Sequence, residues 1–131
     1  MDTENSILYV SYDGILEPLG RSQALAYLEG LSNRNKIYLI SFEKKADLNN
    51  ASLVKKIKDI CLDNNIEWKP FTYHKRLTFM ATIFDILVGT LFSTFLNIKH
   101  SINIIHIRSY IPGLMVLIST TLLKKKLIFD M

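Results

Sequence analysis

Segments typical of buried β-strands alternate with segments of helical periodicity along the whole of this 131-residue chain. The first strand-like run, residues 7–12, is nearly continuous in apolar, β-branched and aromatic residues, as in a strand covered on both faces. Helical segments of crossover length separate it from similar runs at residues 36–42, 66–71, 102–107 and 127–131. Such alternation predicts an α/β fold with a mainly parallel five-stranded sheet, right-handed connections and helices on both faces.

The length and composition favour one domain. A chain with 49% hydrophobic residues can fill its own core, and no repeat or low-complexity linker divides it. Residues 1–131 are therefore expected to form a single Rossmann-like, doubly wound domain. The last strand-like run coincides with the end of the chain, where an open α/β sheet carries a functional loop. We therefore expect the domain to be a fragment of a larger protein.

The charge distribution argues against a nucleic-acid partner. The 16 basic and 12 acidic residues give a formal net charge of +4. Local basic clusters occur at residues 73–76 and 124–126, but lysines and arginines are otherwise spread among carboxylates, and nucleic-acid binding needs a clearer basic face. An acidic phospholipid or a phosphorylated ligand is also compatible with this charge.

The chain has the character of a cytoplasmic protein. Cys61 is the single cysteine and cannot form an internal disulfide. Residues 1–5 have neither the basic region nor the apolar run of a signal peptide. A reducing cytoplasm is the expected location.

Helix starts are marked by capping residues and prolines. After a loop that contains Pro18 and Gly20, Ser22 is placed to cap a helix with an apolar face. Asn49 or Asn50 opens the next helix, and Pro112 suits the first turn of a later one. Pro70 weakens the third strand, because proline within a sheet is confined to edges and bulges.

The stretch 77–98 is long enough to span a bilayer and has basic residues on both sides. Asp85 near its middle would cost about 2.5–3.5 kcal/mol in a membrane, and it belongs to a mildly polar stripe with helical spacing. A span would also separate the third and fourth strands of one sheet. These arguments favour a packed helix over an interfacial helix on a membrane, and both over a true span.

A ligand crevice is expected between the first and fourth strands. In the strand order three, two, one, four, five, the crossover direction reverses there. Gly14 can turn the loop after strand one, and the turn that follows it places backbone amides and a guanidinium at a helix N-terminus, which suits phosphate or carboxylate. The alternative is that these residues only shape the loop and cap the helix. The residues concerned are Asp13, Gly14, Gly20, Arg21, Ser22 and Gln23.

The ends of strands four and five carry three further candidates. His106 and Arg108 alternate with isoleucines and so point to the same side of the strand. His106 is either a ligand contact or a core histidine. Arg108 is expected to have an anionic partner, because its side chain is always charged. Asp130 is a possible partner or general base, or else a solvated strand terminus.

Several chemistries are not supported by the sequence. No glycine-rich dinucleotide fingerprint follows strand one, and no phosphate-binding loop with Gly-Lys-Ser or Gly-Lys-Thr occurs. The histidines and the cysteine have no metal-ligand spacing. A phospho-acceptor receiver domain is not supported either, since strand three ends in Pro-Phe rather than Asp. No cofactor and no metal are expected.

Five segments resemble the N-terminal domain of family-four retaining glycosyltransferases. They are ILYVSYDG at 7–14, LGRSQ with YLEGL at 19–31, YLISFEK at 38–44, IHIRSYIP at 105–112 and LIFDM at 127–131. The resemblance covers nearly the whole chain, and its motifs are moderately specific in combination. That family has two Rossmann-like domains with the active site in the cleft between them.

The resemblance implies that this domain receives the acceptor, while a missing second domain holds most of the nucleotide-diphosphate sugar. It implies that Gly14 and the turn 20–23 face the donor diphosphate or the acceptor, that His106, Arg108 and Ser109 line the acceptor side, and that Asp130 begins the cleft loop. The acceptor would be a carbohydrate or a lipid-linked molecule, and the chain alone would be inactive. Helix 77–98 could contact the inner membrane face. The alternative function is a non-catalytic module that associates with a partner chain or a membrane surface.

Overall fold

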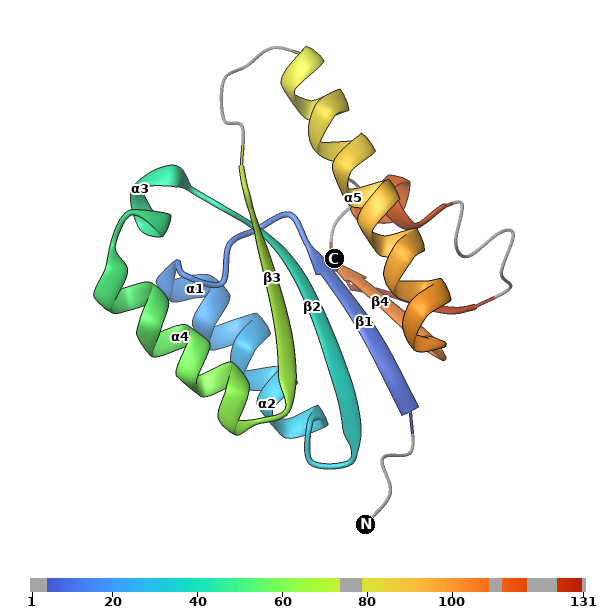
Figure 1. The fold of residues 1–131 in the computed structure, drawn as a ribbon, viewed down its shortest axis with the longest axis horizontal. Helices are drawn as coiled ribbons and strands as arrows, with labels where there is room; N and C mark the ends of the chain where they lie inside the picture. The colour runs from blue at the N-terminus through green and yellow to red at the C-terminus, as the bar shows by residue number, and fades with distance from the viewer. Residues whose placement is uncertain (1–4, 74–78, 109–111, 118–124, 131) are drawn as a thin grey trace.

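Five strands form one all-parallel sheet in the computed structural model, which describes residues 5–73, 79–108, 112–117 and 125–130 (Figure 1). Their order is β3-β2-β1-β4-β5, as the sequence predicts. The fold is a Rossmann-like α/β fold. The strands are β1 (Asn5–Ser11), β2 (Asn35–Glu43), β3 (Ile66–Thr72), β4 (Ile104–Arg108) and β5 (Lys126–Asp130). Pro70 lies in an edge strand, where its missing N–H removes no bond from the centre of the sheet.

One face of the sheet is covered by the N-terminal helices. A continuous helical segment consists of α1 (Pro18–Gly20), the π-helical η1 (Arg21–Leu25) and α2 (Ala26–Leu31). It packs with α4 (Ala51–Asp63), which follows the short helix α3 (Lys45–Leu48). These helices and one set of alternating strand residues enclose the first core, which includes Ile7, Tyr9, Leu25, Leu28, Ile37, Leu39, Ile57 and Cys61.

Helix α4 has the polarity expected of a helix on a soluble protein. Asn50 caps it by accepting a hydrogen bond from the Leu53 amide at 3.2 Å, as predicted. Ile57 and Cys61 are buried on its inner side, while lysines and aspartates occupy its outer side. Asn65, at a φ of 58°, adopts the left-handed conformation that terminates many helices.

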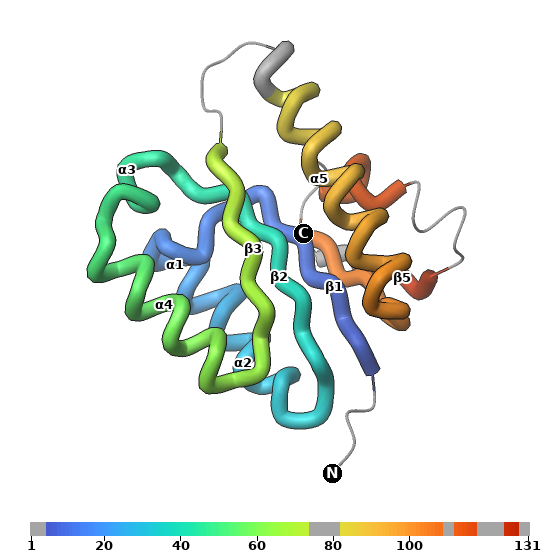
Figure 2. Tube along the Cα trace, viewed as in Figure 1, coloured from blue at the N-terminus to red at the C-terminus, as the bar shows by residue number. Residues whose placement is uncertain are grey.

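The opposite face is covered by α5 (Phe79–His100) and the helical residues 112–117. In Figure 2 the traces of α4 and α5 lie on opposite sides of the strands. Pro112 is helical, and it is the first described residue of the second of these helices; both the start and the rest of its predicted body lie outside the described residues. The two helices touch where Ser93 Oγ donates to the Met115 carbonyl oxygen at 3.2 Å. They enclose the second core, which includes Leu8, Val10, Ile40, Phe42, Leu96, Ile105, Ile107 and Met115.

Helix α5 packs on the sheet with its polar side inward. Asp85 is only 1% exposed, and Ser93 and Asn97 are also buried. From Thr82 to Ile98 every exposed side chain is apolar: Phe84, Leu87, Leu91, Phe95 and Ile98. We call these five residues the outer stripe. By length and composition alone, Thr82–His100 could cross a membrane. The packing of α5 on the sheet agrees with the packed helix favoured by the sequence, with a polarity that the sequence did not predict. Contact of its outer side with a membrane stays a prediction.

Candidate functional site

The site predicted from the sequence lies at the carboxyl ends of β1 and β4, which are neighbours in the sheet. The helical segment that follows β1 packs on one face of the sheet, and the helical residues that follow β4 pack on the other. The crossover direction therefore reverses between these neighbouring strands, as predicted. The site is built from the loop after β1, the helical turn 18–23 and the end of β4.

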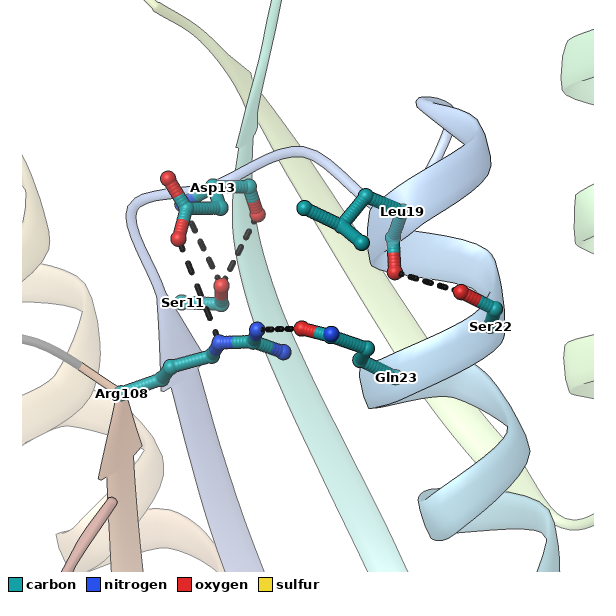
Figure 3. A network of polar contacts seen from close by, with 6 residues as sticks. All are labelled: Ser11, Asp13, Leu19, Ser22, Gln23 and Arg108. Carbon is teal, nitrogen blue, oxygen red and sulfur yellow. Dashed lines mark hydrogen bonds and ion pairs between the residues drawn. The ribbon is translucent and has the colours of Figure 1, made fainter. Parts of the chain in front are cut away.

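Three of the predicted residues meet at this edge. Arg108 Nη2 donates a hydrogen bond to Gln23 Oε1, and Arg108 Nε lies 4.0 Å from Asp13 Oδ2 (Figure 3). The Arg108 side chain is 18% exposed and that of Asp13 is 68% exposed. The guanidinium is thus largely enclosed by protein, while its carboxylate partner faces solvent. The anionic partner expected for Arg108 is Asp13.

Ser11 shapes the loop that carries Asp13. Its Oγ donates to the Asp13 carbonyl oxygen at 2.9 Å and accepts from the Asp13 amide at 3.2 Å (Figure 3). Both bonds close a tight turn directly after the strand. They place the Asp13 carboxylate over the Arg108 side chain, which comes from the adjacent strand.

The two glycines of the site are required for close backbone packing. A Cβ atom on Gly20 would collide with the Gly14 carbonyl oxygen, and one on Gly14 would lie 2.5 Å from Glu43 Oε1. The loop therefore folds back on the first turn of the helix. Gly14 and Gly20 have a packing role here, and a role in ligand contact stays a prediction.

Glu43 fixes this loop, and the sequence did not indicate it as a site residue. Its fully buried carboxylate accepts the amides of Ile15 and Leu16, each at 3.0 Å, and the hydroxyl of Ser41. Burial raises the pKa of Glu43, although these hydrogen bonds act in the opposite direction. The only available signal was a charged residue ending an otherwise buried strand.

The predicted helix start at Ser22 is wrong. The helix begins at Pro18, and Ser22 Oγ donates to the Leu19 carbonyl oxygen at 3.1 Å within it. Proline fixes the φ angle that the first helical residue needs, so it starts the helix a turn earlier. The Arg21 amide donates to the Glu17 carbonyl oxygen at 2.9 Å, and so this part of the expected anion-binding N-terminus lies inside the helix. Arg21 begins the π-helical turn.

His106 lies in the core beside the site. It is 4% exposed and packs between Tyr9 and Tyr27, with ring centroids 4.7 and 5.4 Å away. Of the two alternatives for His106, the structure places it as a core histidine on the same face as Arg108.

The structure says little about the predicted site residues Asp130 and Ser109. Asp130 pairs with Arg108 in the register of β4 and β5, so its backbone stands at the expected strand end. Ser109 lies outside the described residues. Their roles stay predictions.

A pocket of about 280 Å³ adjoins the site on the α5 side. Its wall includes residues from the ends of β1, β2 and β3, and Asp13 belongs both to it and to the Arg108 contact. Most of these residues were not predicted as site residues, because the sequence does not show which loop side chains meet at the ends of the three strands. The lining residues are Tyr12, Asp13, Gly14, Glu17, Phe42, Lys44 and Tyr73.

The described residues contain no group of three or more His, Cys, Asp or Glu side chains that could hold a metal ion. The polar groups at this edge of the sheet are instead arranged as hydrogen-bond donors and acceptors around a partly enclosed guanidinium. Such an arrangement suits a polar organic ligand, whose hydroxyl or carbonyl groups can use both kinds of partner.

Comparisons with known proteins agree on the fold. The chain matches no protein-family model and no curated protein sequence. The C-terminal domain of a hydrogenase from Pyrococcus furiosus aligns with 100% of this chain and 95% of its own length, with a TM-score of 0.63 and 9% identity. Both chains therefore have the same class of α/β domain.

A glycosyltransferase from Rickettsia africae ESF-5 also has this fold. It aligns with 96% of this chain at a TM-score of 0.62 and 14% identity. The present chain spans 29% of the length of that glycosyltransferase. Identities this low establish the fold alone, and one fold hosts many functions.

Proposed function

We propose that this chain is the acceptor-binding half of a glycosyltransferase, which transfers a sugar from a nucleotide-diphosphate sugar to a carbohydrate or lipid-linked acceptor. The resemblance of its sequence segments and the glycosyltransferase neighbour support this proposal. The structural observation that carries it is the guanidinium of Arg108, held by Gln23 and Asp13 at the carboxyl edge of the sheet.

This arrangement suits an acceptor rich in hydroxyl groups. A guanidinium has five N–H donors, so the contacts to Gln23 and Asp13 fix its plane and leave donor capacity for ligand oxygens. The exposed carboxylate of Asp13 can accept a bond from a neighbouring hydroxyl. A donor and an acceptor side by side match the vicinal hydroxyls of a sugar.

The chain by itself is proposed to lack transferase activity. A retaining transfer develops positive charge on the sugar ring and negative charge on the departing diphosphate, and catalysis requires groups that stabilise both charges. By the family resemblance, the groups that grip the donor belong to a second domain. Under this proposal the complete enzyme would work in the cytoplasm, on the inner face of the membrane if its acceptor is lipid-linked.

A glycan array probed with the purified 131-residue chain tests the proposal. We expect binding to a subset of carbohydrates, a loss of at least tenfold in affinity for Arg108→Ala, and unchanged affinity for Arg34→Ala. Arg34 is a matched control because it precedes β2 at the amino end of the strands. The absence of carbohydrate binding, or equal affinity for the wild type and Arg108→Ala, would contradict the proposal.

A second candidate is a non-catalytic module that binds a membrane surface. The observation that favours it is the outer stripe, which exposes apolar side chains along α5 while Asp85, Ser93 and Asn97 are buried. Leu91 is 74% exposed. A soluble protein normally orients such a helix the other way, and exposed apolar patches of this kind mark interaction surfaces.

The groups around the outer stripe favour lipid over a protein partner. Between Thr82 and Ile98 no acidic residue is exposed, and the next exposed residue is Lys99. The Lys99 ammonium lies 5.5 Å from the ring centroid of Phe95, directly beside the stripe. An apolar helix face with a bordering cation is the pattern of helices that lie in the interface of an anionic bilayer.

Vesicle flotation tests this second candidate. The triple variant Phe84→Ser, Leu87→Ser, Leu91→Ser is expected to lose binding to vesicles of phosphatidylglycerol and phosphatidylcholine. Leu62→Ser, at an equally exposed leucine on α4, is the control and should bind as the wild type does. Unchanged flotation of the triple variant would exclude the candidate. Oligomers of the wild type that disappear in the triple variant would indicate a protein partner instead.

A further inference from the structure

We propose that the pocket at the ends of β1, β2 and β3 binds one pyranose ring of the acceptor. This inference rests on the proposed glycosyltransferase function and names the subsite at which a sugar unit is held. It concerns Tyr12, Phe42 and Tyr73 as the wall and Asp13, Glu17 and Lys44 as the polar groups.

The size of the pocket favours a single ring. Its volume of about 280 Å³ lies at the lower end of small-molecule pockets, which run from about 300 to 1,000 Å³. A monosaccharide unit fits such a space, whereas a nucleotide-diphosphate sugar needs a longer cleft. Asp13, which belongs to the pocket wall, is 68% exposed and lies 4.0 Å from Arg108 Nε, so a further sugar or a lipid link could extend past it toward Arg108.

The aromatic side chains of the wall are held by contacts with one another and with α5. The ring of Tyr12 lies 4.9 Å from that of Tyr73 and 5.2 Å from that of Phe42, between centroids. The Tyr12 hydroxyl donates to Asp85 Oδ2 at 2.8 Å, which anchors the ring to α5. The C–H face of a pyranose is apolar and packs on such rings, and a preorganised wall avoids the entropy cost of ordering side chains on binding.

The polar groups suit a neutral, polyhydroxylated ligand better than an anion. The Lys44 ammonium is already paired with Glu17 Oε1 at 2.9 Å, and Asp13 adds a second carboxylate to the wall. A phosphate would meet a cation already neutralised by Glu17 and one further carboxylate, that of Asp13. A sugar ring would offer hydroxyls that donate to Glu17 and Asp13 and accept from Lys44.

Titration with methyl glycosides of glucose, galactose, mannose and N-acetylglucosamine, followed by saturation-transfer NMR, tests the subsite. At least one glycoside is expected to bind the wild type. Tyr73→Ala should weaken that binding at least tenfold, and Tyr73→Phe, which keeps the ring, should weaken it less. Phe95→Ala, an aromatic substitution in the outer stripe, is the control and should leave the affinity unchanged.

A second variant guards against a folding defect in Tyr73→Ala. Glu17→Gln keeps the side-chain shape in a partly exposed position and is expected to weaken glycoside binding about three- to tenfold, while the thermal midpoint stays close to that of the wild type. Equal affinities for the wild type, Tyr73→Ala and Glu17→Gln would overturn the inference. So would saturation transfer to uridine monophosphate in place of every glycoside.

The two proposals fail in different ways. Glycan-array binding that depends on Arg108 but not on Tyr73 or Glu17 would retain the acceptor function and reject this pocket. An array without any bound carbohydrate would reject the acceptor function itself. Methyl glycosides that bind in a Tyr73-dependent manner while Arg108→Ala has no effect would keep the subsite as a sugar site and reject the proposed role of Arg108.

Discussion

Helices α4 and α5 cover opposite faces of one sheet with opposite polarity. Helix α4 buries Ile57 and Cys61 and exposes charged residues. Helix α5 buries Asp85, Ser93 and Asn97 and exposes the outer stripe. The first arrangement gains stability from apolar burial, whereas the second leaves much of its apolar area in contact with solvent. Folding therefore explains the polarity of α4, whereas the outer stripe of α5 is the surface on which the membrane-binding candidate is proposed to act.

The inward polar side of α5 also explains how this helix is held on the sheet. Its inner side is held by specific polar contacts, including Ser93 to the Met115 carbonyl oxygen and Tyr12 to Asp85. Small residues allow close approach, since a Cβ on Gly89 would collide with the Met115 side chain. The inner side of α5 thus combines apolar contacts with hydrogen bonds that place it accurately above the end of β1.

The largest expected difference in stability is between two truncations of apolar residues, one on α4 and one on α5. Ile57→Ala should lower the free energy of unfolding by about 2–5 kcal/mol, because it leaves a cavity in the core. Leu91→Ala, on the outer stripe, should change it by less than about 0.5 kcal/mol. Urea denaturation followed by circular dichroism measures both. Similar losses for the two variants would mean that Leu91 is covered in solution.

The contrast between packed and open positions can be sharpened with two glycines of the first helical segment. Gly20→Ala should destabilise the protein by about 1–3 kcal/mol, because its Cβ meets the Gly14 carbonyl oxygen. Gly30→Ala meets nothing within 4 Å and should stabilise α2 by about 0.5–1 kcal/mol. Thermal melting of both variants measures these two changes in stability. A neutral Gly20→Ala would show that the loop is not folded against the helix.

The buried carboxyl group of Glu43 is expected to make the stability of the fold depend on pH. Because burial raises the pKa of Glu43, the folded chain holds this proton to a higher pH than the unfolded chain. Its contribution to stability is complete below the unfolded value of about 4.5 and is lost as the pH rises through the folded value. The loss is at most about 1.4 kcal/mol per pH unit.

Glu43→Gln cannot titrate and should remove this slope. Urea denaturation at a series of pH values from 4 to 8 measures the slope in the wild type and the variant. Asp63→Asn, at an exposed acidic residue that ends α4, is the control and should keep the wild-type dependence. If both variants and the wild type share one pH profile, Glu43 does not titrate in this range.

The smallest expected effect concerns the link between α5 and the candidate site. Tyr12→Phe removes the hydrogen bond to Asp85 and should lower stability by about 0.5–1.5 kcal/mol. The pKa of the Tyr12 phenol is raised, chiefly by burial and by Asp85, so it stays protonated and donating at neutral pH. Hydrogen exchange of α5 amides should increase locally. Unchanged exchange would show that α5 is positioned without this contact.

The sequence was sufficient to predict the strands, their order and the helix α4. Each depends on a local pattern: continuous apolar runs for buried strands, and Asn50 before an amphipathic segment. The start of the first helical segment was not predicted correctly, because Pro18 was assigned to a loop although proline also suits a first helical turn. Its π-helical turn at Arg21 has no local signature.

The candidate site was predicted only in part, for a physical reason. Arg108 ends β4 and Asp13 follows β1, and the adjacency of these two strands is predicted, so their meeting was foreseeable. Glu43 bonds to amides 27 and 28 residues away, and its buried position depends on tertiary packing. The inward polar side of α5 was also hidden, since periodicity defines two sides of a helix without saying which one faces the sheet.

Trp68 gives the loop an internal optical reporter. It is the single tryptophan of the chain, and its indole N–H donates to Ser41 Oγ at 2.8 Å. Ser41 in turn donates to Glu43, which holds the amides of Ile15 and Leu16. A rearrangement of that loop therefore changes the surroundings of the only indole. Its emission spectrum allows ligand binding to be followed in unlabelled protein, on the timescale of stopped-flow mixing.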